Sequence, residues 1–192
     1  MIRIALIGDI GSGKTHVSRK FNYPVFNADN EVSKLYNKSR KCYNKFKKNF
    51  PKYITKFPIE KKQLSKVILA NQNNLKKIIK IVHPEIRNQM NKFLKKNKKR
   101  KVVVLDIPLL IENKINKRGD ILIFIDAEKK EINKRLKRRN NINMELIKKF
   151  KKLQLPVEIK KKKANFVIKN NFNNNFVKKS VRNILNNILL ND

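Results

Sequence analysis

A stretch near the N-terminus sets narrower limits on fold and chemistry than any other part of the sequence. An apolar run at 4–7 leads directly into Gly8, and after four intervening residues come Gly13, Lys14 and Thr15. This spacing is the G-x-x-x-x-G-K-[ST] pattern, in which a strand ends in a loop that opens a helix. Glycine permits the positive φ angles that let successive backbone N–H groups face phosphate oxygens. The sequence therefore predicts a nucleoside triphosphate site at this loop.

The side chains of the loop have expected tasks in holding a triphosphate. Lys14 is long enough to reach the β- and γ-phosphates, and the Thr15 hydroxyl can ligate Mg²⁺. The alternative is a glycine turn that only joins a strand to a helix. We favour nucleotide binding because an apolar strand precedes the loop and an amphipathic segment follows it. The loop residues predicted to bind the nucleotide are Gly8, Asp9, Ile10, Gly11, Ser12, Gly13, Lys14 and Thr15.

The rest of the chain alternates between short apolar runs and segments with helical periodicity. Runs typical of buried parallel strands occur at 25–29, 102–107, 120–126 and 166–168. Helical spacing covers 14–22, 30–48, 60–70, 73–82, 128–139, 144–155 and 176–190, and Pro84 is expected to begin a further helix as its first residue. The alternation predicts an α/β fold, the three-layer P-loop NTPase fold with a five-stranded parallel sheet. Because the segment at 30–100 is too long for one crossover, it is expected to form a helical insertion.

The composition is strongly basic, with 49 Lys+Arg against 14 Asp+Glu and a net charge of +35. A nucleic-acid surface is one explanation. Compositional drift is the other, because Lys, Asn and Ile all have AT-rich codons and the positive residues are spread along the whole chain. We favour drift, and expect nucleic acid to bind only non-specifically through the charge.

Other compositional features favour a protein of the reducing cytoplasm. Cys42 is the single cysteine, which excludes an internal disulfide, and only two histidines are present, so a Cys/His zinc site is not expected. No apolar run is long enough for a membrane span, and a core strand directly at the N-terminus argues against a signal peptide. The oligomeric state is left open between a monomer and a small homo-oligomer.

Two acidic residues lie at the C-terminal ends of predicted strands, at the edge where the phosphate loop lies. Asp29 can orient a hydroxyl or accept its proton during attack on the γ-phosphorus, although it could instead cap the next helix. Asp106 ends an otherwise apolar strand, where an acid can hold Mg²⁺ directly or through water. Its alternative role is that of a turn residue before a proline.

Basic residues at two further places are candidates for contacts to phosphate or to the acceptor. Arg135 and Arg139 lie four residues apart on a predicted helix and share a face, where guanidinium groups can bind phosphate oxygens. An exposed charge run is the alternative. His83 precedes a proline, with Arg87 one turn further on, and on its own such a histidine is more often structural than catalytic.

Several separated segments together resemble the dephospho-coenzyme A kinase family. The match runs through nearly the whole chain in order, and the Pro-Leu-Leu-x-Glu and His-Pro segments are more specific than the loop, which many NTPases share. The segments that carry the resemblance are the phosphate loop at 8–15, Asn27-Ala28-Asp29, His83-Pro84-Glu85-Ile86-Arg87, Asp106-Ile107-Pro108-Leu109-Leu110-Ile111-Glu112-Asn113, Arg135 with Arg139, Gln154, and 164–171.

The resemblance implies transfer of the ATP γ-phosphate to the ribose 3′-hydroxyl of dephospho-CoA, with Mg²⁺ as cofactor. It implies a nucleotide-binding core at 1–29, 101–134 and 164–192, an acceptor domain at 30–100 and a lid at 135–163. The implied catalytic residues are Asp29 as the base, with Lys14 and Arg139 as neutralising cations. Arg135, Arg139 and Asn171 would bind the nucleotide together with the loop. Thr15 and Asp106 would hold the metal, and the acceptor would contact Asp29, His83, Arg87, Leu109 and Glu112.

Three positions depart from the pattern of the family. Asn27 replaces an aspartate, Asp9 replaces a glycine or small residue, and Val157 stands where arginine is common, so lysines such as Lys160 are expected to compensate. Two rival functions stay open from the sequence. One is a P-loop kinase acting on a nucleoside or nucleotide, and the other is a nucleotide-regulated nucleic-acid-binding protein.

Overall fold

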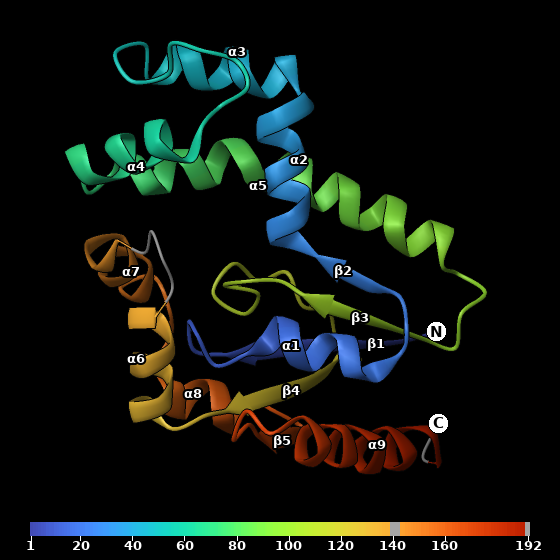
Figure 1. Cartoon of the computed structure of the whole chain (residues 1–192). Helices are drawn as coiled ribbons and strands as arrows, with labels where there is room; N and C mark the ends of the chain where they lie inside the picture. Colours follow the sequence, from blue (N-terminus) through green and yellow to red (C-terminus); the bar gives the residue numbers. More distant parts are fainter. Residues whose placement is uncertain (139–142, 191–192) are drawn as a thin grey trace.

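The structure, a computed structural model, describes residues 1–138 and 143–190 (Figure 1). A single sheet lies at its centre, made of the strands β1 (Ile2–Gly8), β2 (Val25–Asn27), β3 (Val102–Asp106), β4 (Ile121–Asp126) and β5 (Phe166–Lys169). The helices are α1 (Lys14–Ser18), the 3₁₀ turn η1 (Arg19–Phe21), α2 (Ala28–Lys38), α3 (Arg40–Asn49), α4 (Lys61–Ala70), α5 (Asn74–Lys96), α6 (Lys129–Arg138), α7 (Met144–Lys151), α8 (Val157–Lys162) and α9 (Asn174–Leu190).

The sheet confirms the predicted α/β fold with five parallel strands. Its strand order is β2-β3-β1-β4-β5, so β1 lies in the middle and β3 and β4 are its neighbours. In the register of the sheet, Asp106 lies opposite both Leu6 of β1 and Asn27 of β2. The carboxyl ends of the strands therefore meet at one edge, where an open α/β sheet binds its ligand. In Figure 1 the arrowheads point to this edge, toward α6, α7 and α8, while both termini lie at the opposite end.

Alternate side chains of the strands fill two separate apolar cores, one on each face of the sheet. Ile4 and Leu6 of β1 face a core that includes Val17 of α1 and Val177 of α9. The residue between them, Ala5, faces the other core, which the insertion helices α2–α5 share. Successive side chains of a strand point to opposite faces, and a strand covered on both faces needs the continuous apolar run seen in β1.

The helical insertion departs from the prediction at 30–48, which was expected to be one helical segment. Two helices occupy this stretch, because the chain changes direction at Ser39. The Ser39 backbone is extended, and its Oγ accepts a hydrogen bond of 3.1 Å from the Cys42 backbone N–H at the start of α3. A serine at this position satisfies a donor that the first turn leaves open, so it marks a helix start inside a periodic segment.

The prediction that Pro84 begins a separate helix is wrong. Pro84 lies inside α5, a single helix of 23 residues. A proline in a helix interior costs about 3 kcal/mol, because it has no N–H to donate and its ring crowds the preceding turn. A continuous buried stripe runs past it on the other face of α5, and each such side chain contributes roughly 1.5–3 kcal/mol. This stripe, which outweighs the proline, consists of Leu75, Ile78, Val82, Ile86 and Met90.

The C-terminal half of α5 anchors the insertion to the sheet. The rings of Phe93 on α5 and Phe26 on β2 pack with their centroids 5.6 Å apart. The opposite end of α5 packs against α4, which in turn contacts α7 (Figure 1). The insertion therefore reaches from β2 to α7 over the carboxyl edge of the sheet. Within 1–138 and 143–190, no helix has the length and apolar character needed to cross a bilayer.

The exposed position of Pro84 makes it a test of this account of α5. We expect Pro84→Ala to raise the free energy of unfolding by about 2 kcal/mol, because alanine restores a backbone hydrogen bond without disturbing the buried stripe. Urea denaturation followed by circular dichroism would measure the change. Pro156→Ala is the control, since Pro156 is exposed and precedes α8, where no helical bond is lost, and we expect a change of less than about 1 kcal/mol there. A destabilised Pro84→Ala variant would contradict the account.

Candidate active site

The phosphate loop is shaped by glycines that no other residue can replace. Gly13 caps α1 with a φ of 89°, in the left-handed region that side chains rarely adopt. A Cβ atom on Gly13 would also collide with the side-chain amide of Asn170. A Cβ atom on Gly8 would lie 2.8 Å from the Ile125 carbonyl oxygen, so that glycine is needed where β1 passes β4. The predicted loop is therefore formed, and it leads into α1 as expected.

The Lys14 side chain folds back over the loop. Its Nζ donates hydrogen bonds to the carbonyl oxygens of Gly8, at 3.1 Å, and of Asp9, at 2.8 Å. Burial lowers the pKa of Lys14, and the charge of Lys160 lowers it further, whereas Asp106, Asp9 and Asp29 act to raise it. Lys14 therefore lies among three carboxylates at the mouth of the loop, where an ammonium group can meet the phosphates of a nucleotide.

Asp106 is held at the end of β3 by its neighbour on β2. Its side chain is buried, and one carboxylate oxygen accepts a hydrogen bond of 2.6 Å from the Asn27 amide. The Asn27 Oδ1 in turn accepts from the Asn30 backbone N–H at 2.8 Å and so caps α2. Because Asn27 is the cap, Asp29 is not, and the capping alternative for Asp29 is removed. Asp29 instead lies in the first turn of α2, and the residue as a whole is exposed.

The Asp29 carboxylate belongs to the same charged group as Lys14 and Asp106. Partial burial among the surrounding elements raises its pKa, the charge of Asp106 raises it further, and that of Lys14 opposes both. Asp29 thus lies within electrostatic reach of the lysine of the phosphate loop. A carboxylate with a raised pKa, close to a phosphate-binding cation, can accept a proton from a substrate hydroxyl.

An apolar cavity of about 500 Å³ opens beside Asp29. It lies between the insertion, the segment after β3 and α7, and a second cavity of about 850 Å³ adjoins it at Asp29 and Tyr36. His83 and Leu109, both predicted to bind the acceptor, line the first cavity. Burial lowers the pKa of His83, with a further contribution from Arg87, which favours a neutral imidazole. The site thus combines an apolar chamber with a carboxylate at its edge, as small-molecule pockets commonly do.

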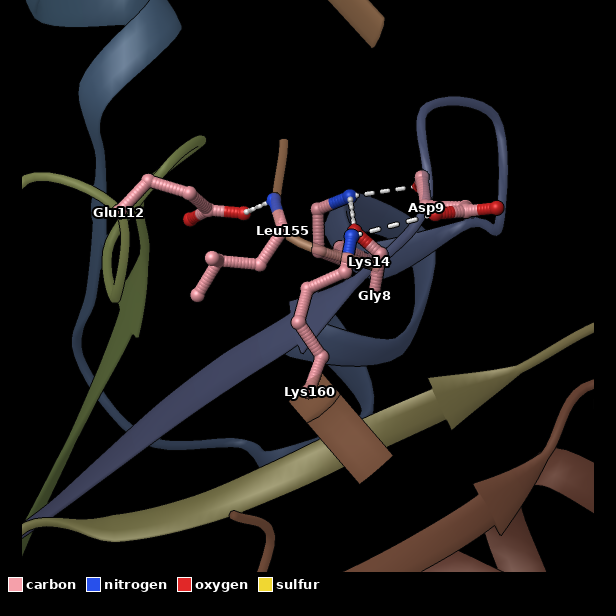
Figure 2. A network of polar contacts seen from close by, with 6 residues as sticks. All are labelled: Gly8, Asp9, Lys14, Glu112, Leu155 and Lys160. Carbon is pink, nitrogen blue, oxygen red and sulfur yellow. Dashed lines mark hydrogen bonds and ion pairs between the residues drawn. The ribbon is translucent and has the colours of Figure 1, made fainter. Parts of the chain in front are cut away.

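The other two residues predicted for the acceptor lie beside this cavity without lining it. The Arg87 guanidinium is exposed and donates a 3.3 Å hydrogen bond to the Asn113 carbonyl oxygen. Glu112 accepts a 3.0 Å hydrogen bond from the Leu155 backbone N–H, in the link between α7 and α8. Glu112 therefore ties the segment after β3 to the predicted lid (Figure 2).

Lys160 compensates for one of the unusual residues that the sequence presents. It is buried in α8, and its Nζ lies 3.1 Å from the Asp9 Oδ1 and 3.5 Å from the Gly8 carbonyl oxygen. Figure 2 shows the Lys14 and Lys160 ammonium groups next to each other, both facing Asp9. The sequence predicts that Lys160 compensates for Val157, where arginine is common; the structure pairs its ammonium group with Asp9, which that prediction did not include.

The segment after β5 supplies contacts that sequence reasoning missed. Asn171, predicted to bind the nucleotide, is exposed and accepts a hydrogen bond from the Asn173 backbone N–H. Its neighbour Asn170 is buried and donates a 2.8 Å hydrogen bond to the Ser12 carbonyl oxygen of the loop. Phe172, also not predicted, lies under the guanidinium of Arg135 at 4.2 Å from the ring centroid. Within an asparagine-rich run no sequence signal separates the buried asparagine from the exposed ones.

Thr15 and Arg139 are the remaining residues predicted for the site. Thr15 is exposed in the first turn of α1, at the carboxyl edge of the sheet that also carries Asp106. Among the described residues 1–138 and 143–190, no three His, Cys, Asp or Glu side chains group together as a metal site. Arg139 lies outside the described residues.

Comparison with known proteins identifies relatives over nearly the full chain. A family model described as dephospho-CoA kinase matches residues 2–175. The dephospho-CoA kinase of Wolbachia pipientis wMel is 34% identical over 193 residues, covering 98% of this chain and 98% of that protein. The dephospho-CoA kinase of Fusobacterium nucleatum subsp. nucleatum is 35% identical over 175 residues, covering 88% and 90%.

Solved structures show the same arrangement of elements. The crystal structure of TT1252 from Thermus thermophilus matches with a TM-score of 0.78 and 25% identity, covering 97% of each chain. The dephospho-CoA kinase from Campylobacter jejuni matches with a TM-score of 0.64 over 97% of this chain and 96% of that one. Its 22% identity means that this second likeness concerns the fold alone.

The buried position of Asn170 generates a prediction about the phosphate loop. We expect Asn170→Ala to raise the KM for ATP about 10-fold, because the loop loses its bond at Ser12 and the following turn loses the bond from the Phe172 N–H. Steady-state kinetics would measure the effect. Asn175→Ala in the same run is the control, because Asn175 is exposed on α9 and should leave the KM unchanged. Equal effects of the two substitutions would argue against a supporting role for Asn170.

Proposed function

The chain belongs to the dephospho-CoA kinase family, and from that premise we propose that it transfers the γ-phosphate of ATP to the ribose 3′-hydroxyl of dephospho-CoA, forming CoA and ADP. The observation that carries the proposal is the position of Asp29. Its carboxylate lies at the edge of the apolar cavity and within electrostatic reach of Lys14 on the phosphate loop. An acceptor in the cavity and a triphosphate on the loop would therefore meet at Asp29.

Asp29 is the proposed base of the reaction. The 3′-oxygen attacks the γ-phosphorus, the bond from that phosphorus to the β,γ-bridging oxygen breaks, and the hydroxyl proton passes to the Asp29 carboxylate. The raised pKa of Asp29 supports this role, because a carboxylate of ordinary pKa holds a proton more weakly. Asp106 contributes to that shift through its charge, so it tunes the base as well as serving the metal site proposed below.

Cations are proposed to stabilise the charge that moves onto the leaving ADP. Lys14 is the cation from the loop, and Arg139, together with Arg135 for the nucleotide, is assigned by the resemblance to the family. The Thr15 hydroxyl and the free oxygen of Asp106 fit Mg²⁺, which keeps several waters and takes few protein oxygens beside those of the phosphates. When bound, the ion would neutralise phosphate oxygens and help to orient them. No covalent intermediate with the protein is needed.

The acceptor is proposed to occupy the two adjoining cavities. Leu109 and His83 would contact it in the apolar cavity, and Arg87 and Glu112 would support that site from its border. The neighbouring cavity includes Lys56 and Lys61, whose charges suit a diphosphate such as that of dephospho-CoA. An extended acceptor would place an apolar arm in the first cavity and an anionic linker in the second.

We propose that three parts of the chain have separate roles. The sheet with α1 and α9 serves as the nucleotide core, 30–100 as the acceptor domain and 135–163 as the lid, whose closure would exclude water from the reacting phosphate. We propose that the protein acts in the cytoplasm as a monomer or small homo-oligomer. The +35 charge would attract nucleic acid without selecting a sequence.

A substrate panel tests the activity itself. We expect dephospho-CoA to stimulate ADP release from ATP at least about 100-fold above the rate without acceptor, since an open site with no acceptor exposes the phosphate only to water. The release of ADP would be followed in a coupled assay with Mg²⁺. Shikimate, adenosine and nucleoside monophosphates in place of dephospho-CoA are the controls. Stimulation by one of them, with none by dephospho-CoA, would reassign the acceptor.

The role of Asp29 has its own test. We expect Asp29→Asn to lower kcat by about 10²–10⁴-fold while the Kd for ATP changes less than about threefold, because the amide keeps the shape but cannot take a proton. Single-turnover kinetics and ATP titration would separate the two effects. Glu31→Gln on the same helix is the matched control, since its carboxylate pairs with Lys34 on the surface. A loss of ATP affinity without a loss of kcat would make Asp29 a structural residue.

A further inference from the structure

Asp9 presents an electrostatic difficulty that the phosphate loop has to resolve. It places a carboxylate between Gly8 and the glycines that surround a bound anion, and its side chain is 26% exposed. A triphosphate carries several negative charges, and like charges a few ångströms apart repel each other strongly where protein excludes water. An isolated carboxylate at this position would therefore weaken the binding of ATP.

Lys160 is a buried positive charge that needs an anionic partner. Its side chain is 2% exposed, and a buried ammonium group is costly unless it is paired. The anionic partner given by the structure is the Asp9 Oδ1 at 3.1 Å, with the Gly8 carbonyl oxygen more distant at 3.5 Å. Lys14 lies close enough to repel it. Each member of the pair thus removes the difficulty that the other presents.

We propose that Lys160 is a positioning residue for ATP, which acts through Asp9 by cancelling its charge and by fixing the loop to α8. Lys160 does not itself hold the triphosphate in this account. The proposal rests on the ATP-dependent function above, but it concerns the binding of ATP alone and needs no acceptor. It assigns a use to a basic residue of the lid that the phosphate-binding pattern leaves unexplained.

A second contact supports the positional half of this proposal. Glu112 accepts a 3.0 Å hydrogen bond from the Leu155 backbone N–H, five residues before Lys160. The segment that leads into α8 is therefore held to the core at two points, one after β3 and one on the phosphate loop (Figure 2). With both ends of this short segment tied, the Lys160 ammonium has little freedom to leave Asp9.

The proposal predicts a specific pattern in a double-mutant cycle. We expect Lys160→Met to raise the Kd for ATP about 10-fold, because it leaves the Asp9 carboxylate uncompensated beside the phosphates. In the Asp9→Gly background the same substitution should raise the Kd by less than about threefold, since no charge then needs cancelling. Calorimetric titration with MgATP, without any acceptor, would measure the four values.

Two control variants distinguish a specific loss of ATP binding from a general loss of folding. Lys161→Met is the matched control, because Lys161 follows on the same helix but pairs with Asp126 at the surface, and the Kd should not change. Lys160→Arg keeps the charge and should retain binding within about threefold. Melting temperatures of all variants would show whether each is folded.

Several results would overturn the proposal. An equal increase of the Kd in both backgrounds would mean that Lys160 contacts the phosphates directly, and an unchanged Kd in folded Lys160→Met would leave the pair a purely structural contact. If Lys160→Met alone does not fold, the comparison of Asp9→Gly with the Asp9→Gly/Lys160→Met double variant decides, since a 10-fold difference there contradicts the account. A failure of dephospho-CoA as acceptor would leave these ATP measurements intact.

Discussion

The site depends on holding positively charged side chains at the carboxyl edge of the sheet, where the protein largely excludes water. Lys14 shows how the requirement is met before any nucleotide arrives. Its ammonium group donates to two carbonyl oxygens of its own loop, and three carboxylates nearby oppose the effect of burial on its pKa. Burying an ammonium group without such partners would destabilise the folded state by several kcal/mol. Groups that the fold already supplies therefore offset part of the cost of burying the Lys14 ammonium group.

The parallel sheet is what brings those groups together. Asn27, Asp106 and Gly8 end three adjacent strands, although they lie far apart in the sequence. The helical insertion then returns over the same edge, and its apolar cavity opens beside Asp29. In the proposed site, this arrangement of strands would set the distance between a nucleotide on the loop and an acceptor in the cavity. This is why membership of the dephospho-CoA kinase family and the geometry of the site lead to the same reaction.

Much of this arrangement could be predicted from the sequence, because the signals were local and periodic. The five strands, the phosphate loop, Asp29 after β2 and Asp106 at the end of β3 all follow from apolar runs and the residues that end them. Pro84 shows where such reasoning fails, since only the tertiary burial of the α5 stripe decides that the helix continues through it. The burial of Lys160 could not be predicted either, because the three residues that follow it are also lysines and only the packing of α8 distinguishes it from them.

The hydrogen bond between Asn27 and Asp106 has a consequence for how such a site tolerates a changing amino-acid composition. An aspartate at position 27 would face Asp106 as a second anion, whereas the amide faces it as a donor at 2.6 Å. Compared with the family pattern, the chain thus carries one negative charge fewer at position 27 of β2 and one more at Asp9. The charge of Asp9 is paired with Lys160. A genome that enriches asparagine and lysine can therefore exchange acids and amides around a reaction centre while its local charge balance stays the same.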